Sequence, residues 1–183
     1  MDEIQIREFD ALRQTIRARG TVRPLAFLGG LIAWSVLLAA VLAWYPNPLI
    51  ATLPLIALVA TFEVVRTLHL GVERIGRYLQ VFFEHRETDA ALVPPAWETT
   101  AMTFGPSVPG AGGHPLFLPI FVLATMLNYL AVVLPGPVAV ELWTLAVPHL
   151  AFIAWMLYAD RAMRKQRAAE LARYRALKNG ART

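Results

Sequence analysis

The chain has 183 residues, of which 57% are hydrophobic and 16% are charged, and its formal net charge is +4. Soluble domains usually carry about 25% charged residues, so this composition, with a mean hydropathy of +0.50, indicates an integral membrane protein. Because the chain has no cysteine, disulfides, thiol nucleophiles and cysteine metal sites are excluded.

The N-terminal stretch from Ile6 to Arg19 has an amphipathic pattern. Its apolar side chains recur at helical spacing and fall on one arc, with charged residues outside it. The arc consists of Ile6, Phe9, Leu12 and Ile16. This pattern favours a short helix that lies in the membrane interface. Acidic residues precede the first apolar run, which argues against a cleaved signal peptide.

Four apolar runs follow, at residues 24–45, 48–65, 115–134 and 137–159. Each has about the length that a helix needs to cross a ~30 Å hydrocarbon core. Helices are the only spanning form that such runs allow, since backbone groups in lipid need internal partners. The sequence therefore predicts an all-α integral membrane protein. Residues 1–183 form a single membrane domain of four transmembrane helices, arranged as two hairpins with a cytoplasmic connection.

A second amphipathic helix is expected after span two, between Gly71 and Arg86. One face of it is strongly apolar and aromatic: Ile75, Tyr78, Leu79, Phe82 and Phe83. The helix either continues span two into the cytoplasm or turns onto the membrane surface. Its apolar face is expected to be buried, either as a cap over the helix ends or as a docking face for a partner.

Two further cytoplasmic segments differ in composition. The connection from Glu87 to Phe117 is rich in Pro and Gly but contains Trp97 and Phe104, so we expect it to tuck against another part of the molecule. The tail, residues 160–183, is basic and helix-forming. We expect it to attract anionic lipid rather than nucleic acid, because no aromatic stacking pattern accompanies the charge.

The basic residues predict the orientation of the chain. All 17 Lys and Arg residues lie before span one, between spans two and three, or in the tail. The turns YPNP (residues 45–48) and PGP (residues 135–137) have none. The positive-inside rule then places both termini and the middle connection in the cytoplasm. We expect the protein in the plasma (inner) membrane.

Polar residues within the spans are the candidate site residues, because such residues are costly in lipid. They are Ser35, Thr61, Glu63, Thr125, Asn128, Glu141 and His149. His149 lies near the bilayer midplane, roughly 18 Å and 16 Å from the two surfaces. We expect it to be neutral, to face the bundle interior and to bond the hydroxyl of Ser35, Thr61 or Thr125.

Other pairs are suggested by spacing. Glu63 and Arg66 are expected to form a local ion pair, and Asn128 and Glu141 to hydrogen-bond across their hairpin as interhelical glue. An outward-facing binding or proton site at Asn128 and Glu141 is the alternative. His69 and Glu73 have the spacing of two metal ligands, but two ligands do not make a site. An exposed ladder of charges that also includes Arg66 and Arg77 is the expectation there.

No motif for nucleophilic, zinc-dependent or phosphate-transfer chemistry is present, and no catalytic residue, metal or cofactor is predicted. An intramembrane enzyme remains an alternative. The expected function is a non-catalytic structural, scaffolding or accessory subunit, with a membrane-protein partner or a homo-oligomer. A small oligomeric transporter or channel, with a polar layer around His149, is the second hypothesis.

Overall fold

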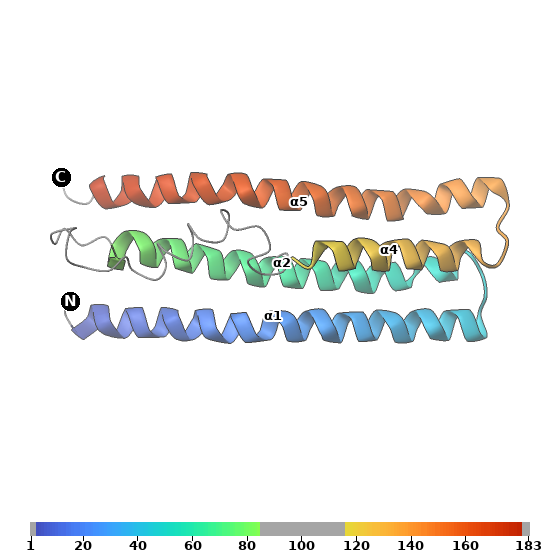
Figure 1. Ribbon diagram of the computed structural model, residues 1–183, viewed down its shortest axis with the longest axis horizontal. Helices are drawn as coiled ribbons and strands as arrows, with labels where there is room; N and C mark the ends of the chain where they lie inside the picture. The colour runs from blue at the N-terminus through green and yellow to red at the C-terminus, as the bar shows by residue number, and fades with distance from the viewer. Residues whose placement is uncertain (1–2, 85–115, 181–183) are drawn as a thin grey trace. The chain divides into compact units, whose positions relative to one another are not determined.

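The computed structural model describes residues 3–84 and 116–180, and the regular structure within those ranges is helical throughout. Four long elements form in chain order: α1 (Glu3–Trp44), α2 (Pro54–Leu79), α4 (Leu118–Val133) and α5 (Ala139–Gly180), drawn in Figure 1. A 3₁₀ turn, η1 (Ile50–Thr52), precedes α2, and a π-helical turn, η2 (Gln80–Glu84), follows it. The predicted all-α class is therefore confirmed for the described residues.

Three of the described helical segments are long and apolar enough to cross a membrane. They are α1, the stretch Ile50–Phe83 and α5. The fourth apolar helix, α4, has 16 residues, which corresponds to roughly 24 Å at about 1.5 Å per residue. That is shorter than the ~30 Å hydrocarbon core, so by length α4 falls short of the span predicted at residues 115–134.

The amphipathic segments are not separate helices. The N-terminal stretch is part of α1, which runs unbroken from Glu3, so the expected separate interfacial helix is not present. The stretch after span two continues α2 to Leu79 and then changes to the wider turn η2, as the first of the two alternatives had it. The tail likewise continues α5 to Gly180. The packing expected of Trp97 and Phe104 lies outside the described residues.

Span two begins differently from the prediction. Instead of a helix from residue 48, an Asn turn comes first, in which the Asn47 side-chain oxygen accepts the backbone N–H groups of Leu49 (2.9 Å) and Ile50 (3.3 Å). The 3₁₀ turn η1 follows, and α2 starts at Pro54. Proline suits a first helical position because its missing N–H would have no partner there.

The chain divides into two compact units. Of the described residues, the apolar unit comprises 22–67 and 116–161, and the polar unit comprises 3–21, 68–84 and 162–180. Each unit therefore takes parts of α1, α2 and α5, whereas α4 belongs to the apolar unit alone.

Aromatic rings form the centre of the apolar unit. Phe62 of α2 is fully buried and meets Phe121 of α4 and Phe152 of α5 edge to face, with centroids 5.4 and 5.8 Å apart. Phe27 of α1 meets Phe121 at 5.5 Å and stacks on Phe117 at 4.1 Å. Such edge-to-face pairs stabilise a core beyond their buried area. Together they tie all four helices of this unit to one another.

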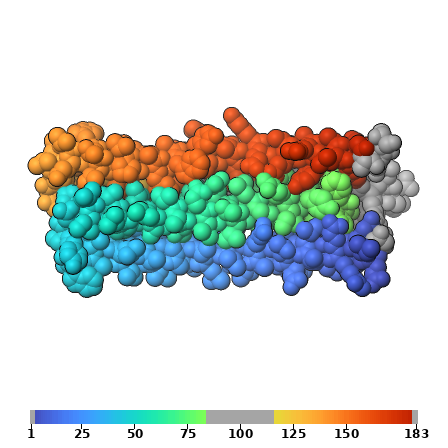
Figure 2. Space-filling view, turned by 180° about the vertical axis from the view of Figure 1, so that it is seen from behind, coloured from blue at the N-terminus to red at the C-terminus, as the bar shows by residue number. Residues whose placement is uncertain are grey.

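A glycine allows α1 and α2 to approach closely in the apolar unit. A Cβ added at Gly30 would lie 2.1 Å from the Thr61 hydroxyl oxygen, whereas one added at Gly29 would meet nothing within 4 Å. Figure 2 shows the cyan start of α2 lying along the second half of α1 on the visible face. Small residues permit this kind of approach between apolar helices, so Gly30 has a packing role that Gly29 lacks.

Candidate functional site

The side chain of Asn128 is the centre of a buried polar network in the apolar unit. Its Oδ1 accepts the indole N–H of Trp34 at 3.0 Å, and its Nδ2 donates to the carbonyl of Ala51 at 3.1 Å. The second Nδ2 hydrogen faces Nε2 of His149 at 3.0 Å. Asn128 is fully buried, so these bonds are made away from solvent. One amide thus joins α1, the η1 turn, α4 and α5.

The geometry determines which nitrogen of His149 carries the proton. Its Nδ1 lies 2.8 Å from the carbonyl of Leu145, which can only accept, so Nδ1 donates. Nε2 faces the Asn128 amide nitrogen, which can only donate, so Nε2 accepts. The opposite orientation of the Asn128 amide is excluded, because it would place the NH₂ group, a donor, against the Trp34 N–H, which is also a donor. The network is therefore consistent with a neutral imidazole that is protonated on Nδ1.

The hydroxyl groups expected to bond His149 have other positions. The Thr61 hydroxyl donates to the Ala57 carbonyl at 2.6 Å, and the Thr125 hydroxyl donates to the Phe121 carbonyl at 2.7 Å. Ser35 is exposed on the surface of the apolar unit. The expectation of a hydroxyl partner is therefore wrong. A threonine hydroxyl in a helix readily donates to the backbone carbonyl one turn earlier. The His149 imidazole is therefore bonded by the Asn128 amide instead.

Glu141 is not joined to Asn128. It is exposed, and its carboxylate accepts the backbone N–H of Val138 at 3.2 Å, just before the first residue of α5. A carboxylate in this position caps the helix and is favoured by the helix dipole. The link between α4 and α5 near this end is made instead by the Tyr129 hydroxyl, which donates to the Leu142 carbonyl at 3.1 Å. The expected Asn128–Glu141 bond is corrected accordingly.

The local ion pair of Glu63 and Arg66 is confirmed, with a shortest N–O distance of 2.7 Å. The second carboxylate oxygen of Glu63 accepts the indole N–H of Trp155 at 2.6 Å. The guanidinium of Arg66 lies 5.6 Å from the centre of the Trp155 ring, a cation–π distance. The charge of Glu63 is thus compensated within the apolar unit.

Three of the charged side chains that join α2 to α5 in the polar unit are buried or half-buried: Arg77, Glu73 and Glu170. Arg77 is 1% exposed and pairs with Glu73 on its own helix (2.7 Å) and with Glu170 on α5 (2.6 Å). Glu73 also pairs with Arg167, and Glu170 also pairs with Arg74 (3.1 Å). The expectation of an exposed ladder at Arg66, His69, Glu73 and Arg77 is therefore wrong for its last three members. Glu73 and Arg77 have partners on α5, more than 90 positions away in sequence, and His69 is buried beside Glu73.

These contacts change the acidity of both carboxyl groups. Burial acts to raise the pKa of Glu73, but the hydrogen bond from Arg167 and the charges of Arg167, His69 and Arg77 outweigh it and hold this pKa below its ordinary value. Burial also acts to raise the pKa of Glu170. Hydrogen bonds from Gln166, Arg77 and Arg74 outweigh that effect, so the pKa of Glu170 is lowered as well. Both groups are ionised at neutral pH.

The predicted docking face is covered by other parts of the polar unit. The Tyr78 and Phe82 rings lie 6.0 and 6.3 Å from Tyr174 of α5, and the Phe83 ring lies 5.6 Å from Phe9 of α1. Leu79 is fully buried and Ile75 is half-buried. Leu79 is thus buried and the other four residues are half-buried, and α1 and α5 of the chain itself provide this cover. Sequence periodicity identifies such a face without identifying its occupant.

The described residues contain no arrangement with evident catalytic chemistry. Within residues 3–84 and 116–180, no three His, Asp or Glu side chains come close enough to hold a metal ion.

The sequence did not predict Trp34 and the Ala51 carbonyl as members of the polar network. An indole N–H in the middle of an apolar run is a signal that would have identified Trp34. Comparison with known protein families, curated proteins and solved structures finds no match for this chain.

Proposed function

We propose that the protein is a non-catalytic accessory or scaffolding subunit of a membrane assembly, built on four transmembrane helices in two hairpins. Three helices have the necessary length and apolar composition. The fourth span would be α4 with its apolar neighbours Leu116, Phe117 and Leu134, and a modest thinning of the bilayer would accommodate its length. Gly136, with φ of +74°, supports a tight turn between α4 and α5.

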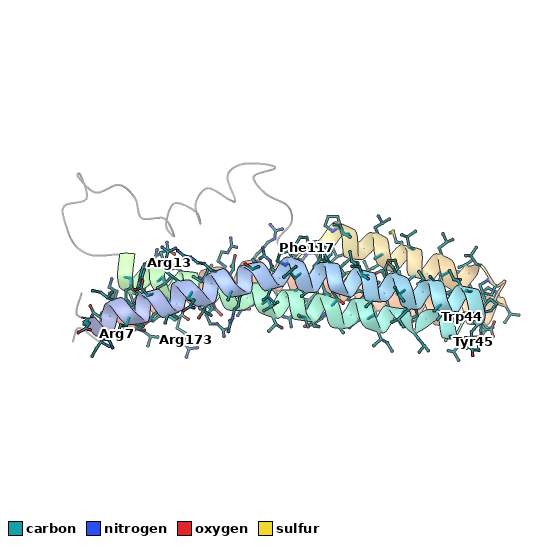
Figure 3. The ribbon with its side chains drawn as sticks, turned by 90° about the horizontal axis from the view of Figure 1, so that it is seen from below. Arg7, Arg13, Trp44, Tyr45, Phe117 and Arg173 are labelled. Carbon is teal, nitrogen blue, oxygen red and sulfur yellow. The ribbon has the colours of Figure 1, made fainter. Side chains whose placement is uncertain are left out.

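In the proposed arrangement the protein lies in the plasma (inner) membrane, with both termini in the cytoplasm. This arrangement rests on the distribution of the 17 basic residues, none of which falls in the two proline turns. Trp44 and Tyr45, labelled in Figure 3 at the end of α1, are aromatic residues suited to the opposite interface. The basic tail would contact anionic lipid.

One observation supports a structural role above the others: the polar layer of the apolar unit is saturated internally. Asn128 uses its carbonyl oxygen and both amide hydrogens on Trp34, Ala51 and His149. His149 uses its remaining nitrogen on Leu145. A transport or catalytic site keeps polar groups available to a substrate, whereas the polar groups of this layer are hydrogen-bonded to one another and join the helices.

The second candidate, a small oligomeric transporter or channel, is favoured by the location of the same layer. Asn128 and His149 are among the few polar side chains buried in the apolar unit, and a permeation path would need polar groups there. In that case several copies would be required, since four spans seldom enclose a path alone.

Isolation of the protein from its native membrane in lipid-containing polymer particles separates the two proposals. We expect a complex of fixed stoichiometry with a second membrane protein, measured by native mass spectrometry. The reconstituted chain alone should give no ion or solute flux in liposomes. A homo-oligomer with flux that Asn128→Leu abolishes, while Thr125→Val leaves it unchanged, would contradict the structural role and support transport.

A further inference from the structure

The N-terminal segment, defined as residues 3–21 of α1, is held weakly within the polar unit. None of its side chains is fully buried, and Phe9, Leu12 and Ile16 are half-buried. Its attachments include the hydrogen bond from the Tyr78 hydroxyl to Glu8 (2.9 Å), the ring contact of Phe9 with Phe83, and the Arg19 side chain, which lies over Gly71 of α2. By contrast, α2 and α5 are joined in this unit by three charge pairs, of which Arg77–Glu170 is buried. Segments with little burial open at low cost.

A glycine and a proline lie where this segment joins the rest of α1. Pro24 is inside the helix and has no N–H, so the carbonyl of Gly20 loses its helical partner. Gly20 itself has open space around the position of a Cβ, so packing does not account for the glycine. Sharp helix bends occur at proline and glycine. The division between the two units falls between these residues, after Thr21.

The exposed chemistry of the segment suits the surface of an anionic membrane. Ile4 and Ile6 are 78% and 48% exposed, and they extend the apolar arc of Phe9, Leu12 and Ile16. Arginines at positions 7, 13, 17 and 19 accompany it, against acidic residues at positions 3, 8 and 10. Figure 3 shows Arg7 and Arg13 on this part of α1. An apolar arc flanked by arginine is the composition of helices that lie in an anionic interface.

We propose that the N-terminal segment has two positions, one docked on the aromatic face of α2 and one lying on the surface of an anionic membrane, with Gly20 and Pro24 as the hinge between them. Phe9, Leu12 and Ile16 cannot face α2 and the lipid at the same time, so the two positions exclude each other. Movement to the membrane uncovers Tyr78 and Phe83. The proposal rests on the proposed membrane-spanning function, which would place the segment beside the bilayer.

The full-length chain in lipid nanodiscs provides the test. Because the native chain has no cysteine, Ile6→Cys offers a single site for an environment-sensitive fluorophore. We expect several-fold higher emission, with a blue shift, in discs of equal phosphatidylcholine and phosphatidylglycerol than in discs of phosphatidylcholine alone. Tyr78→Phe, which removes the bond to Glu8, should increase the signal further. Pro24→Ala should reduce it, while Pro148→Ala in α5 should have no effect.

A charge comparison identifies the lipid as the occupant. Replacing Arg13 and Arg17 by Gln should abolish the dependence on phosphatidylglycerol, whereas the same change at Arg173 and Arg175 of α5 should leave it intact. Equal emission in both lipids would overturn the proposal, and so would a signal that rises with protein density in the disc, which would indicate a second copy. Both faces of a nanodisc have the same lipids, so the result is independent of orientation and of any partner subunit.

Discussion

Replacing Asn128 by Leu should destabilise the apolar unit more than any other change of similar volume on α4. The substitution removes three hydrogen bonds and leaves the Trp34 N–H, the Ala51 carbonyl and Nε2 of His149 without their partner. Interhelical hydrogen bonds in membranes average about 0.6 kcal/mol each, which gives about 2 kcal/mol for three. Any of the orphaned groups that finds no new partner adds about 1–3 kcal/mol.

Thr125→Val is the matched control for this change. Thr125 is also fully buried and lies one turn earlier on α4, but its hydroxyl bonds only the Phe121 carbonyl of its own helix. Val has nearly the same shape, and the Phe121 carbonyl retains its backbone partner, so we expect a loss of no more than the roughly 0.6 kcal/mol of one hydrogen bond. Reversible unfolding in mixed micelles, followed by tryptophan fluorescence, measures both variants.

A double-mutant cycle tests the reasoning directly. Because His149 is one of the groups that Asn128→Leu orphans, adding His149→Leu should cost less than it does in the wild-type chain. Additive losses would mean that the two side chains do not interact. A loss in Asn128→Leu no greater than in Thr125→Val would show that the network is not holding the helices together, and the structural role argued from it would be wrong.

Three further predictions concern other parts of the molecule. Gly30→Ala should lower stability by about 1–3 kcal/mol because its Cβ would overlap Thr61, whereas Gly29→Ala should be neutral or raise stability by up to about 1 kcal/mol; equal thermal melting would contradict the packing assigned to Gly30. In the polar unit, the lowered pKa of Glu73 and of Glu170 means that their stabilising effect is present above the ordinary value of 4.5 and is lost as pH falls below it. Glu170→Gln should therefore reduce the fall in melting temperature as pH decreases below 4.5. An unchanged fall would exclude Glu170 as its source. Single cysteines at Asn47 and Gly136 should react with an impermeant thiol reagent on intact cells while one at Gly112 should not, and labelling at Gly112 would overturn the proposed orientation.

Periodicity and apolar length were enough to predict the helices, since both depend on neighbours in sequence. The pair of Glu63 and Arg66 was predictable for the same reason, because its members are three residues apart on one helix. The apolar arcs of the amphipathic stretches were also correctly identified. The partners of these residues were not predictable. Phe9 packs against Phe83, and Glu73 pairs with Arg167, and both pairs are too far apart in sequence for a local pattern to indicate them.

The partner of His149 illustrates a second limit. Depth along each span placed Ser35, Thr61 and Thr125 close to the imidazole, and depth alone cannot tell which way a side chain points. Two of these hydroxyls are satisfied by their own helix and the third is exposed. Asn128 was assigned to Glu141 because both lie near the outer end, but a carboxylate three residues into a helix has a nearer donor in the helix terminus.

The two units solve the same packing problem with different chemistry. In the polar unit the helices are joined by charged pairs, and Arg77 is buried between two carboxylates. In the apolar unit the fully buried network around Asn128 is neutral: an indole, an amide, an imidazole and a backbone carbonyl, whereas the charged pair of Glu63 and Arg66 is only half-buried. Burying a charge is costly unless it is paired, and the cost is greatest where no water is near. A neutral network satisfies the polar atoms without that cost. Charged pairs between the helices of the polar unit and a neutral buried network in the apolar unit are therefore what a chain needs if the apolar unit lies in lipid and the polar unit lies in water.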